Sequence, residues 1–460
     1  MLEPDYIEHF TDEAEAAVRN LSTDLVALYA SQMPVSERLA MLSPSDIAMA
    51  AQSVARKAVK LLARHSAIID RAAVGAVERA LRRSTTTDVA ALGKTLSWLP
   101  ESVADHLNAT TAASISAIRT VIQRDNLAMA QAAKDAYLRS AMQAVAEVNG
   151  HQKPWEKACR DAVLKLADEG VRIVDYKSKA VAQADVAVRR HIRTQTVQTG
   201  AANTLHLLEK TGHDLVQTSS HGGAREEHAV WQGRIFSLSG KSSKYPDFRE
   251  ATGYGDVAGL CGANCRHSFG VYIEGQPKRY STDPDEEQGR DRDEVYKATQ
   301  KQRYHEREIR RLKREAVALE SASLDNTEER LKIGAHQKAL REHIAEHPHL
   351  SREGKREQVY EHKGKRVYPL SSLENVTAHG RERMRERGVS DIQAANAVAK
   401  PLHMEQPVTD DNGRVSQKII GKHATVVVNP STGDIITAYR TSRSRRRKYE
   451  GGGNGSDGEA

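Results

Sequence analysis

Histidine, arginine and cysteine side chains concentrate in two short stretches near the middle of the chain. The first stretch, SHGGAREEHAVWQGRIFSLSG, spans residues 220–240 and carries His221, Arg225, His228, Trp231 and Gln232. The second stretch, LCGANCRHS, spans residues 260–268 and carries Cys261, Asn264, Cys265, Arg266 and His267. Imidazole and thiolate groups bind zinc, and a thiol beside cations can act as a nucleophile. Three interpretations follow: a metal site, a catalytic site, or polar anchors that order loops and shape a docking surface.

The spacing of these residues helps to decide between a metal site and a set of polar anchors. His221, Arg225 and His228 stand at i, i+4 and i+7, so one face of a helical turn would present all three. A tetrahedral zinc ion would draw on the soft ligands of both stretches, namely His221, His228, Cys261, Cys265 and His267. Zinc sites more often separate two cysteines by two residues, whereas Cys261 and Cys265 are separated by three. We therefore expect no metal and no cofactor, with zinc as the alternative.

Cys265 offers a separate chemical alternative. Arg266 and His267 follow it directly, and neighbouring cations lower the pKa of a thiol and activate it as a nucleophile. Adjacency in the sequence does not establish the geometry that catalysis needs. In the simpler interpretation, the thiols are buried as small apolar groups while the histidines and arginines form hydrogen bonds within a loop-rich core.

The composition of the whole chain is that of a mainly helical protein. Of its 460 residues, 39% are hydrophobic, 28% are charged and only 5% are aromatic, which favours long helices rich in alanine, leucine and valine over large sheets. This length predicts two to four domains. The sequence shows neither an apolar run of membrane-spanning length nor a signal peptide at MLEPDYIEHF, so we expect a protein made in the cytoplasm. Its three cysteines are too few for a disulfide framework.

The excess of positive charge is local. The chain has 68 basic and 61 acidic residues, for a formal net charge of +7. The run RTSRSRRRKYE, residues 440–450, is strongly basic. It is typical either of a phosphate-binding segment or of a solvated terminal arm.

Periodicity and composition divide the chain into five predicted segments. They are a helical bundle at 1–150 with stops at Pro34, Pro44 and Pro100, an α+β core domain at 151–280, a charged helical connector at 281–360, a small α+β domain at 361–448 and a disordered tail at 449–460. Within the core domain, residues 233–280 favour short strands and turns. The predicted fold class is therefore a mainly α N-terminal region followed by two α+β domains.

The connector contains one amphipathic pattern. Apolar residues follow a 3-4-3 spacing at Ile309, Leu312, Ala316 and Leu319. Because the pattern lasts barely two heptads, it predicts a helix laid on the preceding domain through one apolar stripe rather than a free coiled coil. Residues 345–366, AEHPHLSREGKREQVYEHKGKR, have the composition of a linker.

The C-terminal segment predicts two helices followed by three strands. The helices cover 371–388 and 390–401, the second with Ser390 as N-cap, and the strands are RVSQKIIG, HATVVVNP and DIITAYRT. His379, Arg383 and Arg387 are spaced four residues apart on the first helix, and Thr437 and Tyr439 share one face of the last strand.

These side chains would suit metal-free cleavage of RNA if they converge. The imidazole of His379 would move the proton, Arg383 would stabilise the phosphorane charge, and the hydroxyls of Thr437 and Tyr439 would position the phosphate. His423 is a second candidate base. The alternative is that His379 pairs locally and that the arginines form a solvated helix face.

The motifs of the first 360 residues carry a family resemblance. SHGGAREEHAVWQGRIFSLSG, YPDFREATGYG, GLCGANCRHSF and YIEG, in that order, resemble the phage minor capsid protein 2 family, which is related to the Mu F-like head morphogenesis proteins of tailed phages. LADEGVRIVDY and DVAVRRHIRTQTVQT upstream, and REIRRLKRE and HLSREGKREQV downstream, extend it. One departure is Ala263, where the family pattern leads us to expect tryptophan.

The resemblance implies a minor head protein of the virion, assembled in the host cytoplasm and placed near the portal or in the capsid interior. Its implied partners are the portal and major capsid proteins, with packaged DNA as a further one and no membrane. It implies no established chemistry at the histidines and cysteines. Residues 365–443 are similar to small ribonuclease toxin domains of the barnase, EndoU, colicin and RelE group, which are sometimes fused to phage head proteins; the alternative function is thus a capsid-delivered ribonuclease acting on RNA.

Overall fold

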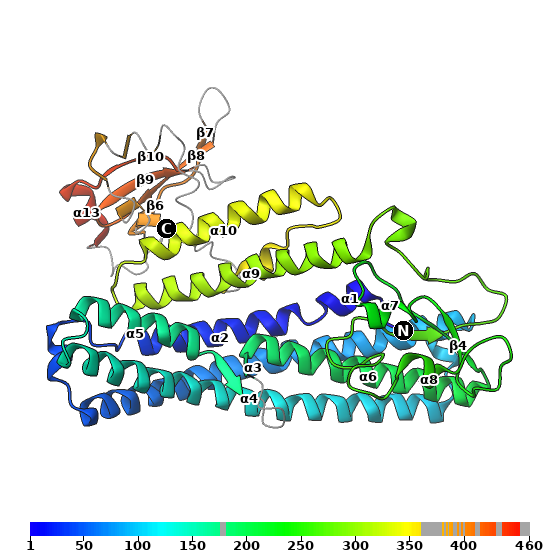
Figure 1. Ribbon diagram of the computed structural model, residues 1–460. Helices are drawn as coiled ribbons and strands as arrows, with labels where there is room; N and C mark the ends of the chain where they lie inside the picture. Colours follow the sequence, from blue (N-terminus) through cyan, green and yellow to red (C-terminus); the bar gives the residue numbers. More distant parts are fainter. Residues whose placement is uncertain are drawn as a thin grey trace, which may run out of the picture. The chain divides into compact units, whose positions relative to one another are not determined.

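The computed structural model describes residues 1–174 and 181–359, and in the C-terminal region residues 380, 383–384, 386–389, 393–394, 397–398, 401–409, 415–428 and 435–450. The chain divides into two compact units (Figure 1). The first comprises Met1–Glu329 with His336–Glu361, and the second comprises Arg330–Ala335 with His362–Ala460. Helices from the predicted bundle, core and connector segments pack together in the first unit. The predicted boundaries near 150, 280 and 360 stay predictions.

Two long helices form the body of the first unit. Helices α3, Pro44–Ala91, and α4, Glu101–Asn149, each measure roughly 70 Å at 1.5 Å per residue and lie side by side (Figure 1). Ser43 begins α3 with a capping box: its hydroxyl accepts a hydrogen bond from the Asp46 amide at 3.2 Å, and the Asp46 carboxylate accepts one from the Ser43 amide at 2.9 Å. Pro44 and Pro100, which the sequence predicts as stops, stand at the starts of α3 and α4.

Small side chains let these helices approach closely. Buried positions on α3 recur every three or four residues and many are alanine, as the list Ile47, Ala51, Val54, Ala58, Ile69, Ala73, Ala76 and Ala80 shows. Helices α2, Asp12–Ala30, and α6, Ala184–Thr211, pack on the long pair, and the short α1, Pro4–His9, precedes α2. The predicted helical character of residues 1–150 is confirmed. No helix among the described residues is long and apolar enough to span a bilayer.

A small antiparallel sheet follows the helical body. Helix α5, Trp155–Glu169, leads to β1, Arg172–Val174, which pairs with β2, Val181–Gln183. After α6 the chain forms a three-stranded sheet with β3, Leu215–Thr218, between β4, Ile235–Ser237, and β5, Phe269–Val271. Two short helices, α7 at Glu226–Ala229 and α8 at Phe248–Thr252, interrupt the connections. The short strands and turns predicted for residues 233–280 are confirmed.

The charged connector belongs to the first unit except at Arg330–Ala335. Helix α9, Arg292–Ser321, packs on α2 and α5 with Ile309, Leu312 and Leu319 buried, as predicted for a docked amphipathic helix. Ala316 is only half-buried, and Ala318 is buried in its place. Of the four predicted positions, Ala316 is therefore the one that lies off the buried stripe. A short 3-10 helix at Glu286–Gln288 precedes α9, and α10, Thr327–Glu346, follows it.

The segment expected to be a linker is packed as far as residue 359. A 3-10 helix at Gly354–Glu357 lies against α9, and the Val359 carbonyl accepts a hydrogen bond from Thr23 at 3.3 Å. Arg356 forms ion pairs with Glu353 at 2.7 Å and with Glu8 at 2.5 Å. The charged composition favours a free linker, but in the structure Arg356 pairs with two partly buried carboxylates.

The second unit contains a five-stranded sheet. Its strands are β6, His403–Met404, β7, Val408–Thr409, β8, Val415–Ile420, β9, Ala424–Val428, and β10, Ile435–Arg440. The order is β10-β9-β8-β6, with β7 also paired to β8, and all pairs are antiparallel. The three predicted strands are confirmed, and two short ones are added.

Helical residues cover the sheet of the second unit. Met384, Ala394 and Ala397, which are helical, pack into one buried cluster with Val426 and Ala438 of the sheet. Helix α13, Arg443–Glu450, follows the last strand and contains most of the basic run. The expected mainly α and α+β fold class is confirmed. His379, Ser390 and residues 451–460 lie outside the described residues. The tail predicted from residue 449 begins too early, because Tyr449 and Glu450 belong to α13.

Candidate functional site

The three-stranded sheet brings the two polar stretches together. Strands β3 and β5 are antiparallel neighbours with Thr218 opposite Phe269, so the residues after β3 lie beside those before β5. The pairing continues past the strands, because the Ser219 amide donates to the Ser268 carbonyl at 2.8 Å. This register places His221 of the first stretch next to His267 of the second.

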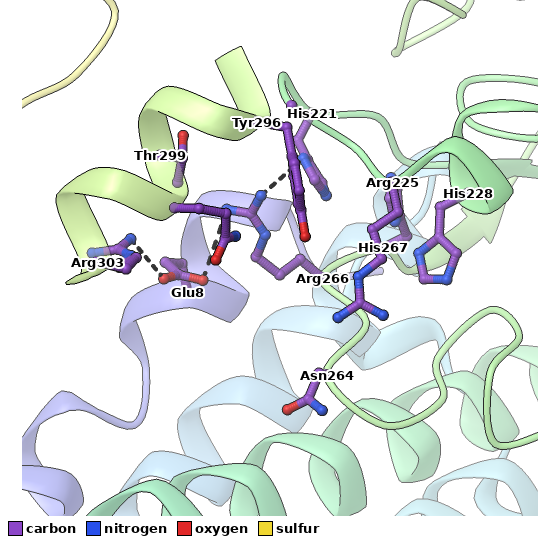
Figure 2. A pocket seen from close by; sticks show the side chains of 12 residues that line it. Glu8, His221, Arg225, His228, Asn264, Arg266, His267, Tyr296, Thr299 and Arg303 are labelled. Carbon is purple, nitrogen blue, oxygen red and sulfur yellow. Dashed lines mark hydrogen bonds and ion pairs between the residues drawn. The ribbon is translucent and has the colours of Figure 1, made fainter. Parts of the chain in front are cut away.

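The His267 ring lies at the centre of an aromatic cluster. It stacks on His221 with ring centroids 4.3 Å apart, and it meets Trp231 edge-on at 4.8 Å and His228 edge-on at 5.5 Å. His267 is 1% exposed and Trp231 is 3% exposed. Figure 2 shows the His221, His228 and His267 rings gathered at one end of a pocket. The predicted association of these residues is therefore observed.

The helical face predicted for the first stretch does not form. Helix α7 contains only Glu226–Ala229, so His221 and Arg225 precede it in the chain. Gly223 has φ +62°, and a Cβ there would lie 3.1 Å from Val295 Cγ1 and 3.3 Å from the Tyr296 nitrogen. A left-handed residue in close contact with α9 prevents a helix at 221–225. His221 and His228 instead meet through a loop that folds back on itself.

The hydrogen bonds of the cluster fix the tautomers of two histidines. The His221 backbone amide lies 3.3 Å from Gln232 Oε1, and because an N–H can only donate, the Gln232 atom facing it is the oxygen. That oxygen also lies 3.2 Å from His267 Nε2, which must therefore carry a proton. His228 Nε2 lies 3.1 Å from the Ala258 carbonyl and must also donate. In both neutral rings, Nδ1 is left as an acceptor.

Cys265 lies where these two acceptors converge. Its Sγ is 3.9 Å from His228 Nδ1 and 3.8 Å from His267 Nδ1, and it accepts a hydrogen bond from the His267 amide at 3.4 Å. Cys261 points its thiol at the His267 carbonyl at 3.8 Å and has φ +62°. Burial raises the pKa of both thiols. An activated cysteine nucleophile, predicted from the neighbouring cations, is therefore not what the structure favours, because desolvation outweighs Arg266.

A pocket of about 170 Å³ opens beside the cluster. Its lining combines the predicted residues His221, Arg225, His228, Asn264, Arg266 and His267 with Glu8, Tyr296, Thr299 and Arg303, as Figure 2 shows. Arg225 and Asn264 are exposed at its rim, and Asn264 has φ +61°. The residues from α1 and α9 carry no motif in the sequence, and only the fold brings them here.

Glu8 balances the positive charge at the pocket. Its carboxylate lies within 4 Å of four guanidinium groups, those of Arg193 at 3.3 Å, Arg266 at 3.9 Å, Arg303 at 3.1 Å and Arg356 at 2.5 Å. Burial alone would raise the pKa of Glu8, but these cations outweigh it and hold the pKa well below its usual range. Burial, with the Arg266 guanidinium alongside, lowers the pKa of His221 to about 3. Burial also lowers the pKa of His267 well below its usual range.

The candidate residues of the second unit form a partial cluster. Tyr439 accepts a hydrogen bond from Arg445 at 3.1 Å, and the Arg387 guanidinium lies 5.9 Å from the centre of its ring. Arg383 pairs with Glu386 at 3.0 Å, and the Thr437 hydroxyl is buried with no hydrogen-bond partner among the described residues. Arg445 was not predicted as a site residue, although the basic run around it was noted. His379 lies outside the described residues.

Comparison with known proteins identifies the family. Residues 42–345 match the family model described as phage minor capsid protein 2. The match covers well over half of the chain, so the chain belongs to the phage minor capsid protein 2 family and is a structural protein of the phage head.

Two curated relatives agree with this assignment. A structural protein of Lactococcus phage LL-H is 28% identical over 179 residues, which cover 37% of this chain and 47% of the relative. A structural protein of Lactococcus phage mv4 is 32% identical over 118 residues, which cover 25% of this chain and 93% of that relative. The chain therefore aligns with about half the length of the LL-H protein. No solved structure matches the chain.

Proposed function

We propose that this protein is a minor head protein that lies near the portal or in the capsid interior and contacts the portal and major capsid proteins. The observation that carries this proposal is the pair of long helices with apolar side chains exposed along them. On α3, Met49 is 64% exposed and Val59 is 63% exposed, and on α4, Leu127 is 66% exposed. Exposed apolar groups on a rigid helical surface are typical of a surface that packs on another protein.

Cross-linking within assembled particles tests this placement. Lys57 and Lys60 are exposed on α3 among these apolar groups, whereas Lys244 lies in a loop of the core region. We expect amine-reactive cross-linking of proheads to join Lys57 or Lys60 to portal or major capsid subunits. Replacing Met49 and Val59 with glutamate should abolish those links and leave the chain out of the proheads. Links only to tail proteins, or incorporation of the glutamate variant at the normal level, would contradict the proposal.

We also propose, as a second function, that the second unit binds and cleaves RNA. The observation that favours it is the contact of two guanidinium groups with one phenol at Tyr439, followed by the five basic residues of α13. Phosphate contacts are supplied by such cations, and a phenol can position a phosphate oxygen. His379 would be the proton-transferring group in this proposal.

A cleavage assay with the full chain tests the second function. We expect the parent protein to cut total bacterial RNA into discrete fragments, and His379→Ala to abolish cutting while RNA binding remains. Tyr439→Phe should slow cutting, and the exposed Arg234→Gln in the first unit is the matched control. Intact RNA with folded parent protein would contradict cleavage, and the same cutting rate in His379→Ala would exclude the proposed mechanism.

A further inference from the structure

Two imidazole lone pairs and one sulfur atom face each other inside the core cluster. The Nδ1 atoms of His228 and His267 are both acceptors, because the Nε2 atoms donate to Ala258 and Gln232. Both Nδ1 atoms point at Cys265 Sγ, at 3.9 Å and 3.8 Å. Among the described residues of this cluster, these three atoms form a group whose members all lie within 4.8 Å of one another.

A protonated thiol cannot satisfy this arrangement. Cys265 has a single proton and can donate to one Nδ1 only, so the other buried acceptor would lack a donor. His228 is 8% exposed and Cys265 is 3% exposed, so bulk solvent does not cover the second acceptor. A divalent cation accepts both lone pairs and the thiolate at once.

We propose that His228, His267 and Cys265 bind one zinc ion through Nδ1, Nδ1 and Sγ, with water in the fourth position. Bond lengths of about 2.0–2.1 Å to nitrogen and 2.3 Å to sulfur place nitrogen and sulfur ligands about 3.6 Å apart in a tetrahedron. The observed separations of 3.8 Å and 3.9 Å are larger by only a few tenths of an ångström. His228 and His267 line the pocket of about 170 Å³, through which water reaches the fourth position.

The surroundings of the three ligands are those of a metal site. Each histidine donates its second ring N–H to a fixed oxygen, which sets the tautomer and orients the ring. The sulfur accepts the His267 amide at 3.4 Å, which favours the thiolate. Repulsion from Arg266 is reduced because its guanidinium lies 3.9 Å from Glu8.

The proposed set is smaller than the five ligands considered from sequence. Cys261 directs its thiol at the His267 carbonyl at 3.8 Å and is not part of the group formed by His228, Cys265 and His267. His221 Nδ1 lies 2.8 Å from the Gly222 carbonyl and must donate to it, so this atom has no lone pair for a metal, and His221 is not part of the group formed by the other three ligands. Zinc would thus connect residue 228 to residues 265–267 and hold the two loops together, in addition to any role of the protein in the phage head.

Metal content and cobalt spectroscopy of the full chain test the site. We expect one zinc per chain after metal-replete purification, and a thiolate-to-cobalt charge-transfer band after exchange with Co²⁺. The three cysteines supply matched variants. Cys265→Ser should abolish the band and weaken zinc binding by at least tenfold, whereas Cys261→Ser and the distant Cys159→Ser should retain both.

The results with these variants distinguish zinc bound at Cys265 from zinc bound elsewhere in the chain. His343, Glu346 and His347 form another possible ligand group, but this group contains no thiol. Cobalt bound there would give no thiolate charge-transfer band, and zinc bound there would be lost in His347→Gln. Absence of the band in the parent protein overturns the proposal, as does a band that survives in Cys265→Ser or disappears in Cys261→Ser. If Cys265→Ser does not fold, as judged by circular dichroism, the parent spectrum and a loss of the band in His228→Gln decide the question.

Discussion

The core cluster around His267 and the basic surface around Tyr439 use similar residue types in opposite ways. Around His267 the polar groups are buried, two of the histidines have fixed tautomers, and a carboxylate balances the nearby arginines. At Tyr439 the Arg445 guanidinium is bonded to a neutral phenol, and the helix that carries it contains four further basic residues. Burial with balanced charge orders loops, whereas a cluster of cations on one helix is suited to an anionic partner.

Removing the largest side chain of the core cluster should have the largest effect. Trp231→Ala should lower the free energy of unfolding by about 4 kcal/mol, because it deletes a buried aromatic that contacts both His228 and His267. The control is Trp98→Ala, since Trp98 is 38% exposed, and its change should stay below about 1.5 kcal/mol. Urea denaturation measures both. Equal losses would mean that the core cluster does not contribute to stability in the way its burial suggests.

Neutralising Glu8 should have the next largest effect. Glu8→Gln leaves four arginines without their shared carboxylate and should lower the free energy of unfolding by about 3 kcal/mol at pH 7. The control is Glu13→Gln, whose ion pair with Arg79 is exposed and contributes at most about 1 kcal/mol.

The effect of Glu8 should also depend on pH with a definite sign. Because the folded-state pKa of Glu8 is lowered, its contribution is present above the unfolded-state pKa of about 4.3 and is lost as the pH falls further. The parent and Glu8→Gln should therefore approach each other in acid. A difference that grows in acid would mean that the carboxylate is protonated first in the folded protein.

His221 should make the metal-free protein sensitive to mild acid. Its folded-state pKa of about 3 lies below the unfolded value of about 6.5, so the unfolded chain binds a proton first as the pH falls. Stability should be complete above pH 6.5 and should fall between pH 6.5 and pH 3, by up to about 1.4 kcal/mol per pH unit for this residue. His221→Gln should flatten the profile measured with a chelator present, while the exposed His213→Gln should leave it as steep as in the parent.

A charge change on the basic surface should have the smallest effect, and only on binding. Arg445→Gln should weaken binding of single-stranded RNA a few-fold and reduce the salt dependence by about 0.7 in logarithmic slope, because one phosphate contact is lost. Its thermal stability should match that of the parent. Filter binding at several salt concentrations measures this, with Arg234→Gln as the control. An unchanged slope would show that Arg445 does not contact phosphate.

Local patterns predicted most of the fold but only part of the site. The prolines at 44 and 100 and the alanine-rich periodicity were sufficient to predict the long helices α3 and α4. Runs of β-branched residues were sufficient to predict the strands β8 to β10. The prediction that His221, Arg225 and His228 share one helical face was wrong, because Gly223 adopts a left-handed conformation against α9. No local sequence pattern reveals that contact. Glu8 was missed because its arginine partners come from four distant parts of the chain. The residue types of the two polar stretches were enough to predict that the stretches lie close together. They did not predict the register of β3 and β5, which brings the stretches together.

The left-handed conformation at residue 261 has a consequence for sequence variation. Cys261 and Asn264 both have φ near +60°, a region that costs most side chains about 1–2 kcal/mol and costs glycine nothing. In a saturation library selected for phage assembly, glycine and asparagine should therefore be enriched at position 261 despite the loss of the thiol. Position 265, with no such backbone preference, should accept few residues other than cysteine. Two cysteines four positions apart would then drift at very different rates among descendants of this phage.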